Sequence, residues 1–104
     1  MRKLLILMRP SELLETHKEA IRFIVASHRG LNPRVFGSVV HGSDTDESDL
    51  DILVDSAKGM TLFDLGAIRY EILQLLGNIK LDVVTPQALP DKWREKVVSE
   101  ARPI

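Results

Sequence analysis

The sequence predicts an α/β fold in which helices pack against a small mixed β-sheet. Apolar residues recur with helical periodicity in three segments, residues 11–29, 61–77 and 91–98. Short apolar runs rich in branched side chains, which are typical of strands, occupy residues 34–38, 49–55 and 79–85. The helical connection 61–77 is long enough to return the chain, so the third strand is expected to run parallel to the second.

The first helix and the first strand are separated by a short turn. Pro10 and Ser11 indicate the start of the helix, with Ser11 as its N-cap, and Gly30 indicates its end. Residues 31–33, "LNP", are typical of a turn, and "RVFGS" then predicts the first strand. A polar loop follows this strand.

The second half of the chain repeats the same kinds of signal. "DLDILVD" predicts the second strand, and "SAKGM" ends it. Thr61 and Asp64 form a plausible capping pair for the following helix, and Gly77 marks its end. "IKLDVVT" predicts the third strand, and Pro90 with Asp91 begins a short last helix.

Composition limits the classes of protein to consider. The 104 residues are expected to form a single domain, 1–104. The absence of cysteine excludes disulfides and thiolate metal sites and favours a cytoplasmic protein. A net charge of −1 with interspersed signs argues against direct nucleic-acid binding. The apolar stretch from Leu4 to Met8 is too short to span a membrane.

Three aspartates are candidates for a metal site. Alternate residues of a strand share a face, so Asp49 and Asp51 point the same way. If the second and third strands are neighbours, Asp82 comes beside them. Three clustered carboxylates repel one another, and a hard divalent cation usually makes such a cluster favourable. Because the ligands are all oxygen atoms, magnesium is the expected ion.

Gly37 and Ser38 suggest phosphate chemistry next to these acids. A glycine allows a phosphate to approach the backbone, and N–H groups at a helix start bind anions. Two magnesium ions can stabilise both the attacking and the leaving oxygen in phosphoryl or nucleotidyl transfer.

Other uses of these residues fit less well. Any one of the aspartates could be an ordinary surface or turn residue, but Asp51 and Asp82 lie inside apolar runs, where an unpartnered charge is costly. A calcium loop that began at Asp44 would need a glycine where Asp49 stands. The G-x-S-x-G motif of serine hydrolases is absent, and an aspartyl phosphatase would have its apolar strand before the acids. His17 and His28 fit a packing or surface role better than metal binding.

The spacing of these residues resembles that of a known superfamily. Gly37-Ser38, ten residues and then Asp49-x-Asp51 match the signature of DNA polymerase β-type nucleotidyltransferases, and Asp82 lies where that superfamily places its third acid. Nearly the whole chain is similar to a minimal nucleotidyltransferase of the antitoxin type. The resemblance implies the polymerase β-like nucleotidyltransferase fold, with no second domain to hold the acceptor.

The function implied by this resemblance is a magnesium-dependent protein adenylyltransferase. Such antitoxins transfer AMP from ATP to a tyrosine hydroxyl of a HEPN-type ribonuclease toxin, their partner in a hetero-oligomer. The resemblance implies that Asp49, Asp51 and Asp82 bind magnesium and that Asp82 also helps to deprotonate the hydroxyl. It also implies a nucleotide site formed by Gly37, Ser38, His41 and Ser48.

One departure and two alternative functions remain. Many relatives have an arginine near the phosphates where this chain has His41, which either donates to a phosphate or only fills the turn. The chain could instead be a weak or inactive enzyme that blocks the toxin in a stable complex, with Trp93 contributing apolar surface. Transfer to a small molecule would require an acceptor pocket from a second chain.

Overall fold

One mixed sheet organises the molecule, in the strand order β3-β2-β1-β4. The computed structural model describes residues 8–77 and 79–104, so Leu4–Leu7 of the short apolar stretch lie outside the described residues. The strands are β1 (Gly30–Phe36), β2 (Leu50–Ser56), β3 (Leu81–Val84) and β4 (Arg102–Pro103). β1 is antiparallel to β2 and β4, whereas β2 and β3 are parallel. The mixed sheet and the parallel pairing predicted from the sequence are confirmed.

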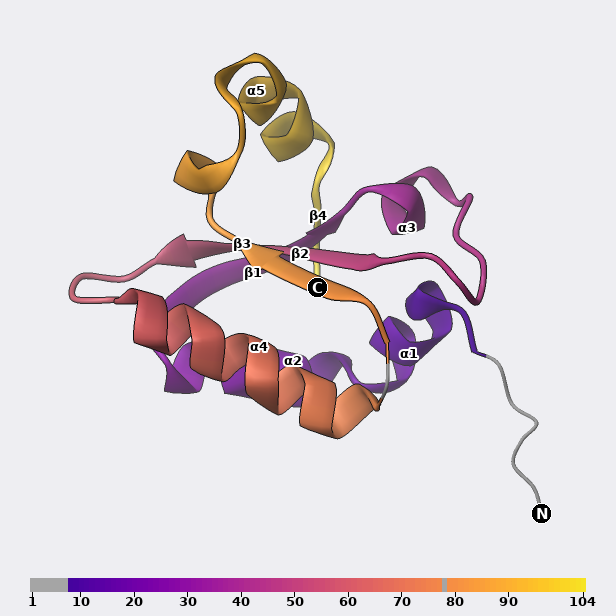
Figure 1. The fold of residues 1–104 in the computed structure, drawn as a ribbon, viewed down its shortest axis with the longest axis horizontal. Coiled ribbons are helices and arrows are strands. Elements are labelled where there is room, and N and C mark those ends of the chain that lie inside the picture. The colour runs from indigo at the N-terminus through magenta and orange to yellow at the C-terminus, as the bar shows by residue number, and fades with distance from the viewer. Residues whose placement is uncertain (1–7, 78) are drawn as a thin grey trace.

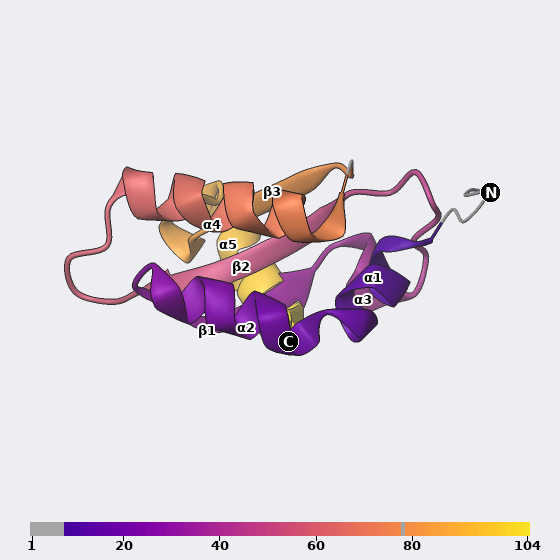
Figure 2. The ribbon, with the colours of Figure 1, turned by 90° about the horizontal axis from the view of Figure 1, so that it is seen from below.

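Helices cover the two faces of the sheet unequally. They are α1 (Pro10–Thr16), α2 (Lys18–Ser27), α3 (Ser38–His41), α4 (Leu62–Leu76), the 3-10 turn η1 (Pro86–Ala88) and α5 (Asp91–Glu100). Figure 1 shows α1, α2 and α4 on one face, and α3 and α5 on the other. In Figure 2, which views the molecule from below, α2 and α4 lie side by side in front of the strands. Among the residues described, no helix combines the length and apolar character needed to cross a membrane.

The hydrophobic core lies between the sheet and the layer formed by α1, α2 and α4. The largest fully buried members of the core cluster are aliphatic: Ile21, Val25, Leu50, Ile52, Val54, Ile68 and Ile72. Alternate residues of β2 point into this core, so the residues between them, which include Asp51, face α3 and α5. The second face of the sheet is therefore available for polar groups.

The core predicts a large difference between two substitutions on α4. Ile68 is fully buried and should lose about 2–5 kcal/mol of unfolding free energy on replacement by alanine, because the cavity refills only in part. Leu62 is 85% exposed on the same helix, and Leu62→Ala should change that energy by less than about 0.5 kcal/mol. Urea unfolding of both variants measures the difference; equal losses would contradict this core.

The N-terminal helix differs from its prediction in two ways. It starts at Pro10 with Arg9 as N-cap, so the prediction of Ser11 as N-cap was wrong. The backbone N–H of Ser11 instead donates to the Asp44 carboxylate at 2.9 Å. The helix also breaks at His17, whose φ of −117° and ψ of 20° are not helical, and this divides it into α1 and α2. The predicted capping pair of Thr61 and Asp64, and the end of α4 at Gly77, are confirmed.

The first strand is longer at its start and shorter at its end than predicted. It begins at Gly30, so residues 31–33 lie within β1 rather than in a turn. The turn signal corresponds to an irregularity in the pairing with β2 between Leu31 and Arg34, where Asn32 has a φ of 52°. β1 ends at Phe36, and Ser38 already belongs to the short helix α3.

Candidate active site

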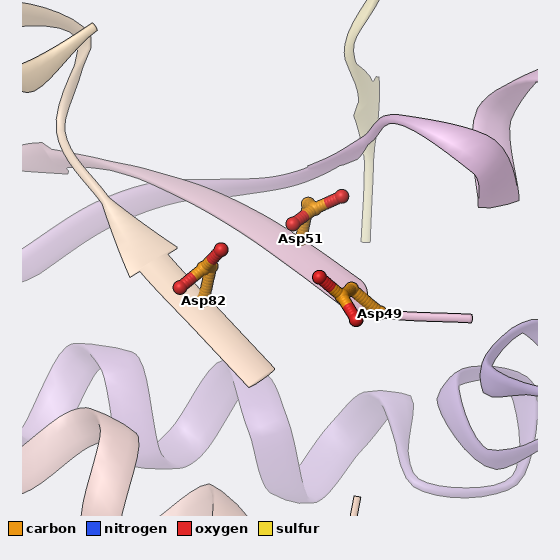
Figure 3. A group of neighbouring side chains, drawn as sticks. All are labelled: Asp49, Asp51 and Asp82. Carbon is orange, nitrogen blue, oxygen red and sulfur yellow. The ribbon is translucent and has the colours of Figure 1, made fainter. Parts of the chain in front are cut away.

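Three carboxylates meet on the face of the sheet that bears α3 and α5. Asp51 and Asp82 are paired neighbours on the parallel strands β2 and β3, and Asp49 directly precedes β2. One carboxylate oxygen from each of the three lies within 4.8 Å of the others. Figure 3 shows the side chains turned toward a common space. The structure thus brings Asp82 beside Asp49 and Asp51, as the strand pattern predicts.

The electrostatics of this cluster are unfavourable without a cation. Partial burial raises the pKa of Asp51 to about 6, with further contributions from the charges of Asp82 and Asp49. Asp49 and Asp82 are exposed, whereas Asp51 is half-buried between them. Placing negative charge on all three therefore costs free energy that a bound cation would offset.

The chemistry of the cluster fits magnesium. Its donors are three carboxylates, which are hard oxygen ligands, and their separation allows one or two small divalent ions to be shared. The exposure of Asp49 and Asp82 leaves room for water or substrate oxygens, which Mg²⁺ usually keeps as ligands. The residues present are therefore suited to hold this ion.

Gly37 brings the backbone against the Asp51 carboxylate. It precedes α3 with a φ of 79° and a ψ of −148°, a conformation that is essentially restricted to glycine. A Cβ atom at this position would overlap the Asp51 Oδ2 oxygen. A larger residue therefore fits neither the backbone nor the space, and Ser38 follows directly as the first residue of α3.

The two other expected nucleotide-site residues have partners within the chain. His41 Nε2 lies 3.2 Å from Glu100 Oε1, so the imidazole of α3 faces a carboxylate of α5. The Ser48 hydroxyl accepts a hydrogen bond from the Thr45 backbone N–H at 2.8 Å. Ser48 also lines a cavity of about 310 Å³ together with Lys80. His41 thus links two helices, a role that neither reading of the sequence included.

Asp44 is a further residue whose position was not predicted. Its side chain is buried, and it caps the start of α1 through the Ser11 N–H. Burial alone would raise the pKa of Asp44, but the hydrogen bonds from Ser11 and the charge of Arg9 bring it below its usual value. The loop before Asp49 is thereby tied to α1. The two partners are 33 residues apart, and no local pattern indicates such a contact.

A mixed sheet with Asp51 and Asp82 on adjacent strands, Asp49 just before one of them and a glycine against Asp51 is suited to nucleotidyl transfer. Residues 32–104 match the family described as "Polymerase beta, Nucleotidyltransferase". The chain belongs to this family and has its fold, and by class it is a nucleotidyltransferase enzyme.

Similar proteins agree with this assignment. Two proteins of Methanocaldococcus jannaschii, both named "Putative protein adenylyltransferase", are 31% and 27% identical to the chain. The first alignment covers 81% of this chain and 89% of the relative, and the second covers 86% and 87%. A solved "putative minimal nucleotidyltransferase" has 37% identity and a TM-score of 0.80, covering 90% of this chain and 95% of that one.

A more distant structure shares the fold. It is described as a "toxin-antitoxin with AMP-PNP" and has 18% identity and a TM-score of 0.67. The match covers 83% of this chain and 70% of that chain.

Proposed function

We propose that this protein is a magnesium-dependent protein adenylyltransferase that transfers AMP from ATP to a partner toxin and thereby acts as its antitoxin. The observation that carries the proposal is the group of Asp49, Asp51 and Asp82, whose oxygens lie within 4.8 Å of one another. The relatives named as protein adenylyltransferases support a protein as acceptor. The fold shared with a toxin–antitoxin structure supports a toxin as that protein.

Each site residue has a defined task in this reaction. Asp49, Asp51 and Asp82 would hold magnesium, which when bound polarises the α-phosphate and stabilises the charge of the leaving pyrophosphate. The backbone at Gly37 and Ser38 would hold the pyrophosphate end of ATP. The acceptor oxygen forms a bond to the α-phosphorus as the bond to the β-phosphate oxygen breaks. Asp82 is exposed, and its carboxylate would take the proton from the acceptor hydroxyl.

The proposed acceptor is a tyrosine hydroxyl of a HEPN-type ribonuclease toxin held in a hetero-oligomer. The pKa of a tyrosine hydroxyl is about 10, so a nearby base is needed to form the nucleophile. Asp82 belongs to β3, the outermost strand on its side of the sheet, and this position leaves it open to a large partner. We place the reaction in the cytoplasm, where a protein without cysteine needs no disulfide for stability.

The test is the mass of the toxin after incubation with this protein, ATP and Mg²⁺. The toxin mass should rise by whole AMP units, and fragmentation should locate them on tyrosine. The double variant Asp49→Asn/Asp51→Asn is the control and should leave the mass unchanged. An unchanged toxin mass with the wild-type protein would overturn the proposal. Continued neutralisation of the toxin by the double variant would show instead that a stable complex is sufficient.

A further inference from the structure

We propose that the cavity between α3 and α5 binds the base of the nucleotide, with Trp93 as the surface on which it stacks. The cavity has a volume of about 200 Å³, and its walls include Gly37, His41, Trp93, Lys96 and Glu100. This is about the liquid volume of seven water molecules, enough for one ring system but not for a whole nucleotide. The assignment rests on the proposed function, since it places one part of the substrate of that reaction.

The cavity adjoins the carboxylate cluster through Gly37. The same glycine forms part of the cavity wall and lies against the Asp51 carboxylate. α5, which supplies Trp93, stands on the same face of the sheet as α3 (Figure 1), and the three carboxylates lie on that face as well. A nucleotide whose phosphates lie at the carboxylates can therefore reach the cavity with another part of the same molecule.

The geometry of the reaction indicates that the cavity is occupied by the nucleotide rather than by the acceptor. In phosphoryl transfer, the attacking and leaving oxygens lie roughly in line on opposite sides of the phosphorus. If Gly37 holds the leaving pyrophosphate, the acceptor hydroxyl approaches from the opposite side, near Asp82. The cavity lies on the Gly37 side, so the group that enters it belongs to the nucleotide.

The lining of the cavity fits a flat neutral ring better than a phosphate. Lys96 and Glu100 carry opposite charges, and His41 faces Glu100 at 3.2 Å, so the charged groups of the wall largely balance. A phosphate group would be repelled by the Glu100 carboxylate. An uncharged base meets no such repulsion and gains from contact with the indole ring.

Trp93 is placed for stacking rather than for packing the core. Its side chain is 49% exposed, and no residue of α5, every one of which the structure describes, is fully buried. The Lys92 ammonium lies over the indole at 5.5 Å from its centroid, so one face already carries a cation. The second face can accept a base, and stacking on an aromatic side chain typically changes affinity by on the order of 10- to 100-fold.

Trp93 is the sole tryptophan of the sequence, so its fluorescence reports directly on this site. In the presence of Mg²⁺, ATP should quench the Trp93 fluorescence of this chain saturably, whereas inorganic tripolyphosphate should not. By calorimetry, Trp93→Ala should raise the Kd for ATP by on the order of 10- to 100-fold and leave the Kd for tripolyphosphate unchanged. Phe63→Ala is the matched control, because Phe63 is an aromatic residue 90% exposed on α4, and it should change neither Kd.

The outcomes separate this inference from the proposed function. ATP binding without quenching, an unchanged Kd in Trp93→Ala or equal quenching by tripolyphosphate would each overturn the stacking site, and AMP transfer to the toxin could still occur. Quenching by ATP with the predicted loss of affinity would support the site even if no AMP reached the toxin. A thermal midpoint of Trp93→Ala equal to that of the wild type verifies that the variant is folded.

Discussion

Replacement of Asp51 by asparagine is expected to abolish AMP transfer and, in the same variant, to stabilise the metal-free protein. An amide is a poor magnesium ligand, so kcat/KM should fall on the order of 1,000-fold, the equivalent of about 4 kcal/mol of transition-state stabilisation. The gain in stability comes from the removal of a charge that partial burial disfavours and that Asp82 and Asp49 repel. The two effects have opposite signs, which a variant that is simply misfolded cannot reproduce.

The pH dependence gives the sign of the stability effect. The pKa of Asp51 is about 6 in the folded protein, against an ordinary value of 3.8 for an aspartate in the unfolded chain. Between these values the folded state keeps a proton that the unfolded state has released, so stability falls as the pH rises through this window. Asparagine has no proton to lose, so Asp51→Asn should be more stable than the wild type above pH 6. After discounting for the exposure of this half-buried group, we expect about 1 kcal/mol, or a few degrees in Tm.

Thermal unfolding in EDTA at pH 7.5 and at pH 4 measures this effect. The advantage of Asp51→Asn should be present at pH 7.5 and nearly absent at pH 4. Asp55→Asn is the control on the same strand, because the Asp55 carboxylate pairs with the buried guanidinium of Arg34 instead of facing other acids. It should lower Tm at pH 7.5. A lower Tm for Asp51→Asn at pH 7.5 would contradict the repulsion inferred for the cluster.

Gly37→Ala should greatly reduce activity, whereas Gly77→Ala should reduce only stability. The two glycines have nearly the same backbone conformation, with φ and ψ of 79° and −148° at Gly37 and of 92° and −155° at Gly77. Alanine in this region costs about 1–3 kcal/mol at either position. Only at Gly37 would the added Cβ meet the Asp51 carboxylate, since a Cβ at Gly77 has no described atom within 4 Å apart from those of its chain neighbours.

Comparison of the two variants therefore separates the effect of the contact with Asp51 on activity from the effect of backbone strain. We expect kcat/KM of Gly37→Ala to fall on the order of 100-fold, as when a reacting group is displaced by about 1 Å. Gly77→Ala should keep kcat/KM within about a factor of two at a temperature where both variants are folded. Equal activities of the two variants would show that Gly37 does not position the site.

Local patterns were sufficient to predict the part of the site built on strands. The alternation of β2 placed Asp49 and Asp51 on one face, and the helical length of residues 61–77 implied a third strand parallel to the second. Asp82 was expected beside them if the two strands are neighbours, and in the structure they are. The contact between Asp44 and Ser11 and the pair of His41 with Glu100 depend on how distant segments pack. Neither contact is accompanied by a periodicity or a residue spacing that indicates it, so neither was predicted from the sequence. The length of Pro-containing β1 was missed because its irregular pairing looks locally like a turn.

The alternation of β2 has a consequence for how this gene can change. Leu50 and Ile52 pack in the hydrophobic core, and Asp51 between them belongs to the carboxylate cluster. Residues needed for stability and residues of the site therefore alternate along this strand. Loss of one codon within this strand would exchange the two sets and place carboxylates in the core. Insertions and deletions in related sequences should therefore occur in the loop before Asp49, while β2 keeps its number of residues.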